Sequence, residues 1–331
     1  MISLGNGEEW KDFSLGVTKD EYHSLEVVIN RQFALNGWFS KENVKSSMLA
    51  LGDQLTPEKL NEWTSNYSFS ESPKRVGLIM AGNIPLVGFH DFLCVLVSGN
   101  IAVCKLSSDD KTLLPALAER LIEFAPGLKD RISFVEGKIG ELDAVIATGS
   151  DNSLKYFEQY FGRYPHVFRK NRTSVAVLDG TETKEDIALL GKDIFSYFGL
   201  GCRNVSHLLL PIGFNTDRIF EGIYAFHEVV NNNKYGNNYD YNKAVYLMNQ
   251  HKLLDNNFVL LRESEELFSP LSMIHYHYYT SEEEVSRYLL NHQDEIQVVV
   301  GKTGMPFGHA QQPGLMDYAD GVDVMSWLTT V

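Results

Sequence analysis

Cysteine, clustered basic residues and long apolar runs are all scarce in this sequence, and each shortage argues against a class of protein. Three cysteines among 331 residues, with no CxxC pair, argue against a disulfide scaffold and favour a reducing compartment. Asp and Glu outnumber Lys and Arg by 43 to 29, and no long Lys/Arg block occurs. We therefore expect no nucleic-acid partner.

The apolar runs, such as those at 207–212 and 297–301, are far shorter than the roughly 20 residues that a membrane helix needs. No integral membrane segment is therefore expected. The first residues lack the basic-then-apolar order of a signal peptide, and we expect a cytoplasmic protein. His275 and His277 would share one strand face, but no third ligand is spaced nearby, so we predict no metal site.

The two common phosphate-binding motifs, GxGxxG and GxxxxGK[ST], are also absent, so a nucleotide site must use other groups. One candidate is the strand end and helix start around Lys105. Another is the turn of Thr148, Gly149 and Ser150, which would aim helix amides at an anion. Taken alone, each is better explained as an ordinary capped turn between a strand and a helix.

The chain is long enough for two domains, because single cores stop growing near roughly 250 to 300 residues. The sequence of residues 1–70 predicts helices, for example one that starts with Thr56 as its cap and Pro57 as its first residue. From residue 75, short apolar runs alternate with polar helical segments, which predicts a parallel, doubly wound sheet, and a second such series follows Cys202. We predict an α/β protein with a helical and nucleotide-binding domain at 1–195 and a second α/β domain at 196–331.

Two local predictions concern the second series. Residues 231–243 are rich in Asn and Gly and poor in aliphatic side chains, which predicts a surface loop. Thr280 and Glu283 have the spacing of a capping box and predict the start of a helix.

Cys202 differs from the other two cysteines, which lie within apolar runs where a thiol usually packs as a small hydrophobe. Gly199 and Gly201 precede it and allow a close backbone approach in a turn. Two interpretations stay open: a structural thiol, or a nucleophile exposed at a domain junction. His207 and His309 are candidate proton donors, although cysteine and histidine pair in space rather than in sequence.

The order of several segments resembles the aldehyde dehydrogenase superfamily, most closely its acyl-CoA reductase branch, which includes the bacterial bioluminescence fatty-acid reductase. The resemblance implies an aldehyde dehydrogenase-like fold with a Rossmann-like cofactor domain and an α/β catalytic domain. The segments that carry it are AGNIPL (81–86), SGNIAVCKLSS (98–108), ATGS (147–150), GLGC (199–202), EELFSPL (265–271) and the C-terminal stretch 307–328.

The resemblance implies a role for each matching residue. Cys202 would be the nucleophile, and Asn83 would stabilise the developing oxyanion together with the backbone N–H of Cys202. Lys105 would bind the adenosine ribose, and Gly149 and Ser150, after Thr148, would lie near the pyrophosphate.

The same resemblance assigns Glu266 to the nicotinamide ribose and Phe268 to a place beside it. Ser108 stands where many NAD-specific relatives carry a carboxylate, and a hydroxyl tolerates a 2′-phosphate better, so NADPH is expected, with NADH as the alternative. Phe168 stands where aldehyde-oxidising relatives carry a Glu that activates water. Without that base, an acyl thioester survives until it is reduced.

These assignments imply a thioester mechanism in which Cys202 takes an acyl group from an acyl-CoA or acyl-protein donor and holds it for reduction to the aldehyde. One alternative is a reductase of an acyl phosphate or of a short-chain acyl-CoA. Another is a non-catalytic, acyl-carrying subunit that binds an acyl-activating enzyme. Assembly as a homo-oligomer is left open.

Overall fold

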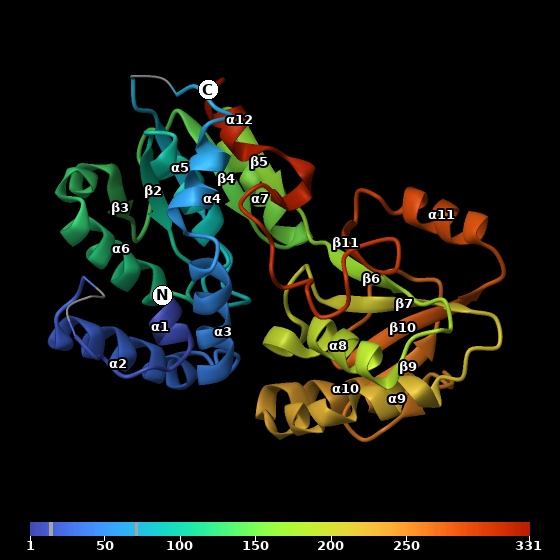
Figure 1. Ribbon diagram of the computed structural model, residues 1–331. Helices are drawn as coiled ribbons and strands as arrows, with labels where there is room; N and C mark the ends of the chain where they lie inside the picture. The colour runs from blue at the N-terminus through green and yellow to red at the C-terminus, as the bar shows by residue number, and fades with distance from the viewer. Residues whose placement is uncertain (13–15, 70–71) are drawn as a thin grey trace. The chain divides into compact units, whose positions relative to one another are not determined.

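The computed structural model describes residues 1–12, 16–69 and 72–331, which form two compact units (Figure 1). Unit 1 consists of Met1–Asn171 and Gly314–Val331, and unit 2 is the continuous segment Arg172–Pro313. The division therefore lies between Asn171 and Arg172 rather than near residue 195. The reason is that the strand at 173–177 pairs within the sheet of unit 2.

The sheet of unit 1 has five parallel strands in the order β3-β2-β1-β4-β5, which confirms the predicted parallel, doubly wound arrangement. Its edge strand β5 was not among the strands predicted, because its short, polar sequence HVFR does not read as an apolar run. The strands are β1 (Arg75–Ile79), β2 (Ile101–Lys105), β3 (Ile132–Phe134), β4 (Ala144–Thr148) and β5 (His166–Arg169).

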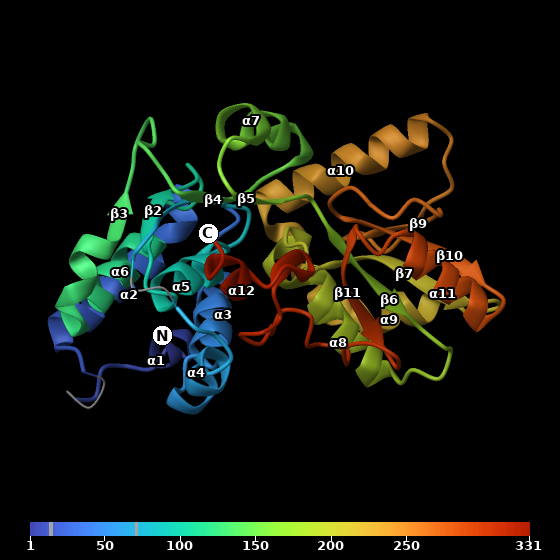
Figure 2. The ribbon, with the colours of Figure 1, turned by 90° about the horizontal axis from the view of Figure 1, so that it is seen from above.

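Alternate side chains of these strands enter two separate apolar layers. Leu78, Cys104 and Ile146 belong to the larger one, which also receives α5 (Phe89–Val97) and α6 (Leu113–Phe124). Val103 and Val145 point the other way, toward Phe157 of α7 (Asp151–Phe161), and Figure 2 shows α7 beside β4 and β5. The strands are therefore buried on both faces, as a parallel sheet requires.

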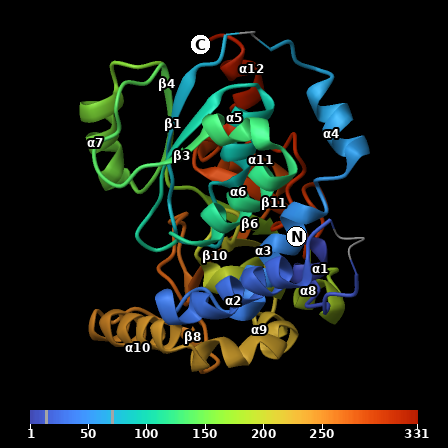
Figure 3. The same cartoon turned by 90° about the vertical axis from the view of Figure 1, so that its left-hand side faces the viewer.

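Within the described residues, four α-helices precede the sheet, as predicted for the first seventy residues, of which 13–15 and 70 lie outside the described ranges. Thr56 caps α4 by accepting the N–H of Lys59, and Pro57 is the first helical residue. Figure 3 shows α1, α2 and α3 grouped near the N-terminus. The helices are α1 (Ile2–Gly5), α2 (Lys19–Leu35), α3 (Lys41–Gly52) and α4 (Pro57–Thr64), and a short helix η2 (Pro126–Arg131) follows α6 later in unit 1.

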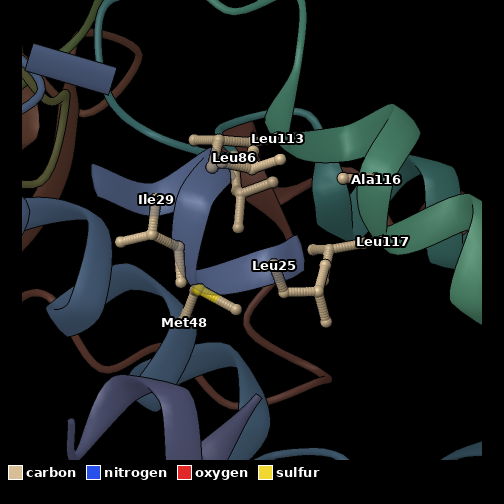
Figure 4. Close-up of a pocket in the computed structure, with 8 residues that line it drawn as sticks. Leu25, Ile29, Met48, Leu86, Leu113, Ala116 and Leu117 are labelled. Carbon is tan, nitrogen blue, oxygen red and sulfur yellow. The ribbon is translucent and has the colours of Figure 1, made fainter. Parts of the chain in front are cut away.

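A small cavity lies where these helices meet the sheet unit, among Leu25, Met48, Leu86 and Leu113 (Figure 4). Its lining is entirely apolar, and its volume of ≈ 10 Å³ leaves room for about one water molecule at most. We therefore interpret it as a packing void rather than a ligand site.

The last residues return to unit 1 through η5 (Ala319–Gly321) and α12 (Val324–Leu328), which packs against α5. Arg169 joins this segment to the sheet from the end of β5. Its guanidinium donates to both carboxylate oxygens of Asp91, at 2.6 and 3.2 Å, and to the carbonyl of Ala319 at 2.7 Å. The pair is buried, with side-chain exposures of 6% for Arg169 and 13% for Asp91.

The sheet of unit 2 has six strands in the order β11-β6-β7-β10-β9-β8. All pair in parallel except β8, which is antiparallel to β9. The strands are β6 (Thr173–Val177), β7 (Val205–Pro211), β8 (Leu254–Asp255), β9 (Leu260–Glu263), β10 (Met273–Tyr279) and β11 (Ile296–Gly301).

Helices cover both faces of this sheet, with α11 on one face and α8 on the other (Figure 1). The helices are α8 (Lys184–Phe195), η3 (Ser196–Gly199), α9 (Asp217–Ile223), η4 (Tyr224–Asn231), α10 (Asn233–Met248) and α11 (Glu282–Asn291). No helix among the described residues is long and apolar enough to cross a membrane.

One local prediction in unit 2 is wrong, and the predicted helix start near Thr280 is confirmed with a shifted cap. The predicted loop at 231–243 is mostly the helix α10, because Asn232 caps it and because Tyr235, Tyr239 and Asn242 form a buried stripe of polar and aromatic side chains. The cap of α11 is one residue later than predicted. Ser281, not Thr280, accepts the amide of the third helical residue, Glu284.

Candidate active site

The nucleotide-binding residues predicted in unit 1 gather at the carboxyl edge of its sheet. Lys105 and Thr148 are the last residues of β2 and β4, and Asn83 lies in the turn that follows β1. The strand order reverses between β1 and β4, and ligands of open α/β sheets bind outside the carboxyl ends of the strands at such a point.

Two glycines let the turns at this edge approach closely. A Cβ atom on Gly82 would lie 2.7 Å from the side chain of Ser107, which places the turn of Asn83 beside the turn of Ser107 and Ser108. A Cβ atom on Gly149 would lie 2.8 Å from that of Ser153. Both positions therefore exclude larger residues, because only glycine allows these turns to pack so closely on their neighbours.

The polar groups at this edge face solvent. Asn83, Ser108 and Ser150 are exposed, and the Lys105 ammonium donates to the carbonyl of Gly137 at 3.0 Å. Ser150 is the N-cap of α7, but its hydroxyl contacts that of Ser153 instead of capping the helix amides. The arrangement suits an anion, because the start of a helix carries a partial positive charge.

In unit 2, Cys202 lies between η3 and β7 and is half-buried, whereas Cys94 and Cys104 are fully buried. Burial raises the pKa of the Cys104 thiol to about 12, which makes it unreactive. The turn before Cys202 contains three consecutive left-handed residues, Tyr197 (φ 53°), Phe198 (φ 58°) and Gly199 (φ 80°). The thiol is thus presented by an unusual turn.

Hydrogen bonds hold the backbone on both sides of Cys202. The Asn204 side chain accepts the N–H of Gly201 at 2.8 Å, and the Ser174 hydroxyl donates to the carbonyl of Cys202 at 3.0 Å. Neither residue was predicted, and nothing in the sequence distinguishes them from ordinary polar residues beside a strand.

A loop at 305–310 is tied to the same region. Arg203 donates to the carbonyl of Ala310, and Asp193 of α8 accepts the N–H groups of Gly308 at 2.6 Å and Ala310 at 2.9 Å. His309 is exposed on this loop, with Nδ1 3.0 Å from the Phe307 carbonyl. His309 therefore stays a candidate proton donor.

Glu266 and Phe268 follow β9, and both side chains are exposed. Arg262 donates to the Glu266 carboxylate at 3.0 Å, and this hydrogen bond lowers the pKa of Glu266. Two buried histidines hold the backbone of the same residue. Nδ1 of His207 and Nδ1 of His275 lie 3.0 and 2.9 Å from the Glu266 carbonyl oxygen.

His207 is fully buried, and both of its ring nitrogens are engaged. With Nδ1 donating to the Glu266 carbonyl, Nε2 accepts from Nδ1 of His277 at 2.8 Å. Burial, reinforced by His277, lowers the pKa of His207 to about 3. His207 is therefore not available as a proton donor to a substrate.

The neutral His207 makes unit 2 sensitive to acid. In an unfolded chain its pKa is about 6.5, so between about pH 6.5 and 3 the unfolded state binds a proton that the folded state does not. Stability therefore falls as the pH decreases through this window, by about 2 kcal/mol between pH 7 and pH 5 from this residue.

We expect this loss in the opening free energy of β7 and β10, measured by hydrogen exchange and mass spectrometry of their peptides. His207→Gln should have a smaller pH dependence than the wild type, whereas His251→Gln, at an exposed position, should keep it in full. An equal pH dependence in all three proteins would contradict the prediction.

Phe168 lies in β5. The family resemblance places it where aldehyde-oxidising relatives carry a Glu that activates water. Its ring stacks on that of His166 at 4.0 Å between centroids and packs on Phe157 at 5.8 Å. The side chain is thus part of the apolar layer under α7. Within the described residues, no group of His, Cys, Asp and Glu side chains is arranged to hold a metal ion.

Comparison with known families gives one match. The family described as Acyl-CoA reductase (LuxC) matches residues 16–211, which is more than half of the chain. No curated protein matches the sequence. The family match covers Asn83, Lys105, Gly149 and Cys202, but not the segment of Glu266.

Solved structures of aldehyde dehydrogenases are similar in fold. The Mycobacterium tuberculosis enzyme complexed with NAD⁺ is 15% identical, with a TM-score of 0.63 over 85% of this chain and 69% of that one. An NADP-dependent enzyme of Escherichia coli is 12% identical, with a TM-score of 0.58 over 85% and 70%. E. coli lactaldehyde dehydrogenase is 13% identical, with a TM-score of 0.59 over 85% and 72%. The predicted aldehyde dehydrogenase-like fold is confirmed.

Proposed function

This chain belongs to the acyl-CoA reductase (LuxC) family, and from that premise we propose that it reduces a fatty acyl-CoA to the aldehyde, with NADPH as reductant, through an acyl thioester on Cys202. The family and the aldehyde dehydrogenase-like fold support an oxidoreductase that acts on the aldehyde group. The proposal of a thioester on Cys202 rests on the turn that presents this residue. The half-buried thiol comes shortly after three left-handed residues, and hydrogen bonds fix the peptide groups on both sides of it.

The residues at the carboxyl edge of unit 1 fit a dinucleotide. Gly149 lets the end of β4 pack closely on Ser153 and Phe157 of α7, at whose start helix amides favour a pyrophosphate. Lys105 would bind the adenosine ribose, and Ser108, which carries no negative charge, would admit a 2′-phosphate. Glu266 and Phe268 of unit 2 would receive the nicotinamide ribose.

Cys202 would act as the thiolate that attacks the acyl-CoA carbonyl, and CoA would leave as its thiolate, so that one thioester replaces another. The backbone N–H of Cys202, with Asn83 as the second donor implied by the family resemblance, would stabilise the oxygen of each tetrahedral species. When bound, the reduced nicotinamide would supply the hydride chemistry, while Cys202 would hold the acyl carbon in place as its thioester. Cys202 then carries a thiohemiacetal, which collapses to the aldehyde and the free thiolate.

Phe168 supports reduction rather than hydrolysis. By the family resemblance, aldehyde-oxidising relatives carry their water-activating Glu at this position, and Phe168 supplies no carboxylate, so the thioester would persist until a hydride reaches it. The following test separates this proposal from three alternatives: a short-chain acyl-CoA as substrate, an acyl phosphate as substrate, and a role as an acyl-carrying subunit without reductase activity.

The proposed function is tested by incubating the protein with radiolabelled long-chain acyl-CoA without cofactor. We expect one acyl group per chain, located on the peptide of Cys202 by mass spectrometry. NADPH should then release the label as aldehyde. A label that NADPH does not release would indicate an acyl-carrying subunit, and labelling only by short acyl-CoA or by acyl phosphate would replace the substrate proposed.

The cofactor preference gives a separate prediction at Ser108, which is exposed after β2. The wild type is expected to use NADPH with a higher kcat/KM than NADH. Ser108→Asp should lower kcat/KM for NADPH about tenfold, because a carboxylate repels the 2′-phosphate, whereas Ser108→Ala should not. Efficiencies with NADH and NADPH within a factor of two in the wild type would contradict it.

A further inference from the structure

The backbone that presents Cys202 needs support from its surroundings. Tyr197 and Phe198 both adopt left-handed φ angles, of 53° and 58°, which glycine adopts readily and bulky residues rarely do. Such backbone persists only where neighbouring contacts specify it, and it concentrates at functional sites. Two polar side chains, Asn204 and Ser174, add hydrogen bonds on either side of the residue that this turn presents.

Asn204 ties the end of α8 to the turn. It is 2% exposed, and its amide donates to the carbonyls of Asp193 (3.0 Å), Ile194 (3.2 Å) and Ser196 (2.9 Å), which lie at a helix end where carbonyls lack helical partners. Its carbonyl oxygen accepts the N–H of Gly201 at 2.8 Å. Only a carboxamide of this length offers donors and an acceptor at once.

Ser174 acts from β6 on the other side of the nucleophile. Its side chain is fully buried, and its hydroxyl donates to the carbonyl of Cys202 at 3.0 Å. The peptide before Gly201 and the peptide after Cys202 are thus both held. The peptide between them carries the N–H of Cys202, and its carbonyl, that of Gly201, accepts the backbone N–H of Asn204 at 3.0 Å. The direction of the Cys202 N–H is therefore set by this bond together with the two side chains.

We propose that Asn204 and Ser174 are positioning residues for the acylation of Cys202. Both bond backbone groups beside the nucleophile, and they act by fixing the direction of the Cys202 N–H and of its side chain. This inference rests on the proposed function, because it assigns the N–H to the oxygen of the acyl group. It adds two residues that the family resemblance did not bring forward.

The decisive measurement is the rate of Cys202 acylation by long-chain acyl-CoA without cofactor. Ser174→Ala is expected to slow acylation about tenfold and Asn204→Ala about 100-fold, because misplacement by about 1 Å costs rate on this scale. Ser206→Ala is the matched control. Its hydroxyl, on the neighbouring strand β7, contacts Thr173 and not Cys202, so acylation should keep the wild-type rate.

A second readout separates positioning from folding. Alkylation of Cys202 by iodoacetamide needs an accessible thiolate but no oxyanion donor. Ser174→Ala should therefore keep its alkylation rate while acylation falls, and it should stay folded with a slightly lower unfolding midpoint, because a buried hydrogen bond is lost. Acylation of Ser174→Ala at the wild-type rate would overturn the proposal, and so would an equal loss of acylation and alkylation. If Asn204→Ala does not fold, Ser174→Ala still decides.

The wild-type protein distinguishes the two levels of inference. If it acquires no acyl label at Cys202, the proposed function fails, and the positioning roles fail with it. If the wild type is acylated and Ser174→Ala matches it, the positioning proposal alone fails.

Discussion

Cys202→Ala is expected to abolish the acyl label and to lower aldehyde formation by a factor of about 10³ or more. Removing the nucleophile of a covalent mechanism eliminates the acyl-enzyme, and the remaining oxyanion donors and binding groups cannot replace it. The measurement is single-turnover aldehyde formation from acyl-CoA and NADPH, followed by quenching and product analysis.

Cys104→Ala is the matched control for this experiment. Cys104 is a buried thiol of unit 1 with a raised pKa, so its removal should leave labelling and turnover at the wild-type level per folded molecule. If Cys202→Ala still acquires the label or still forms aldehyde, another residue is the nucleophile.

Arg169→Met is expected to destabilise unit 1 by about 3–5 kcal/mol, because it leaves the Asp91 carboxylate buried without its cation. It also removes the donor to the Ala319 carbonyl, which ties the C-terminal segment to β5. All four tryptophans of the chain (Trp10, Trp38, Trp63 and Trp327) lie in unit 1, so their fluorescence during urea unfolding reports on this unit.

Two further variants test the reason for that loss. Lys170→Met, at the exposed neighbouring position, should change stability little. The double variant Arg169→Met, Asp91→Leu should recover part of the stability, because it removes the carboxylate that Arg169 binds most closely, whereas Asp320, 4.0 Å from the guanidinium, keeps its charge. If the double variant is as unstable as the single one, the uncompensated carboxylate is not the cause.

The sequence was sufficient to predict the parallel sheets and the helical first seventy residues, because both follow from apolar periodicity and local caps. It misplaced the boundary between units, because β6 is the same kind of apolar run as the strands before it, and only its pairing with β7 and β11 assigns it to unit 2. Strand pairing between distant segments has no local signal.

The candidate site divides in the same way. Cys202, Lys105 and Glu266 could be proposed from segments with a characteristic order. The residues that fix the backbone of the site could not be predicted from the sequence. Asn204 and His275 bond the carbonyls of Asp193 and Glu266, which come near them only in the folded chain. The helix α10 was missed because its buried stripe uses Tyr and Asn in place of aliphatic residues.

The return of the chain to unit 1 has a consequence for biosynthesis. Leu315, Val324, Met325 and Leu328 belong to the core of unit 1, yet they follow the whole of unit 2 in the sequence. On the ribosome, unit 2 is therefore complete before unit 1 receives its last helix. Unit 1 therefore cannot complete its core until unit 2 has been synthesised, unlike the usual case in which the N-terminal domain folds first.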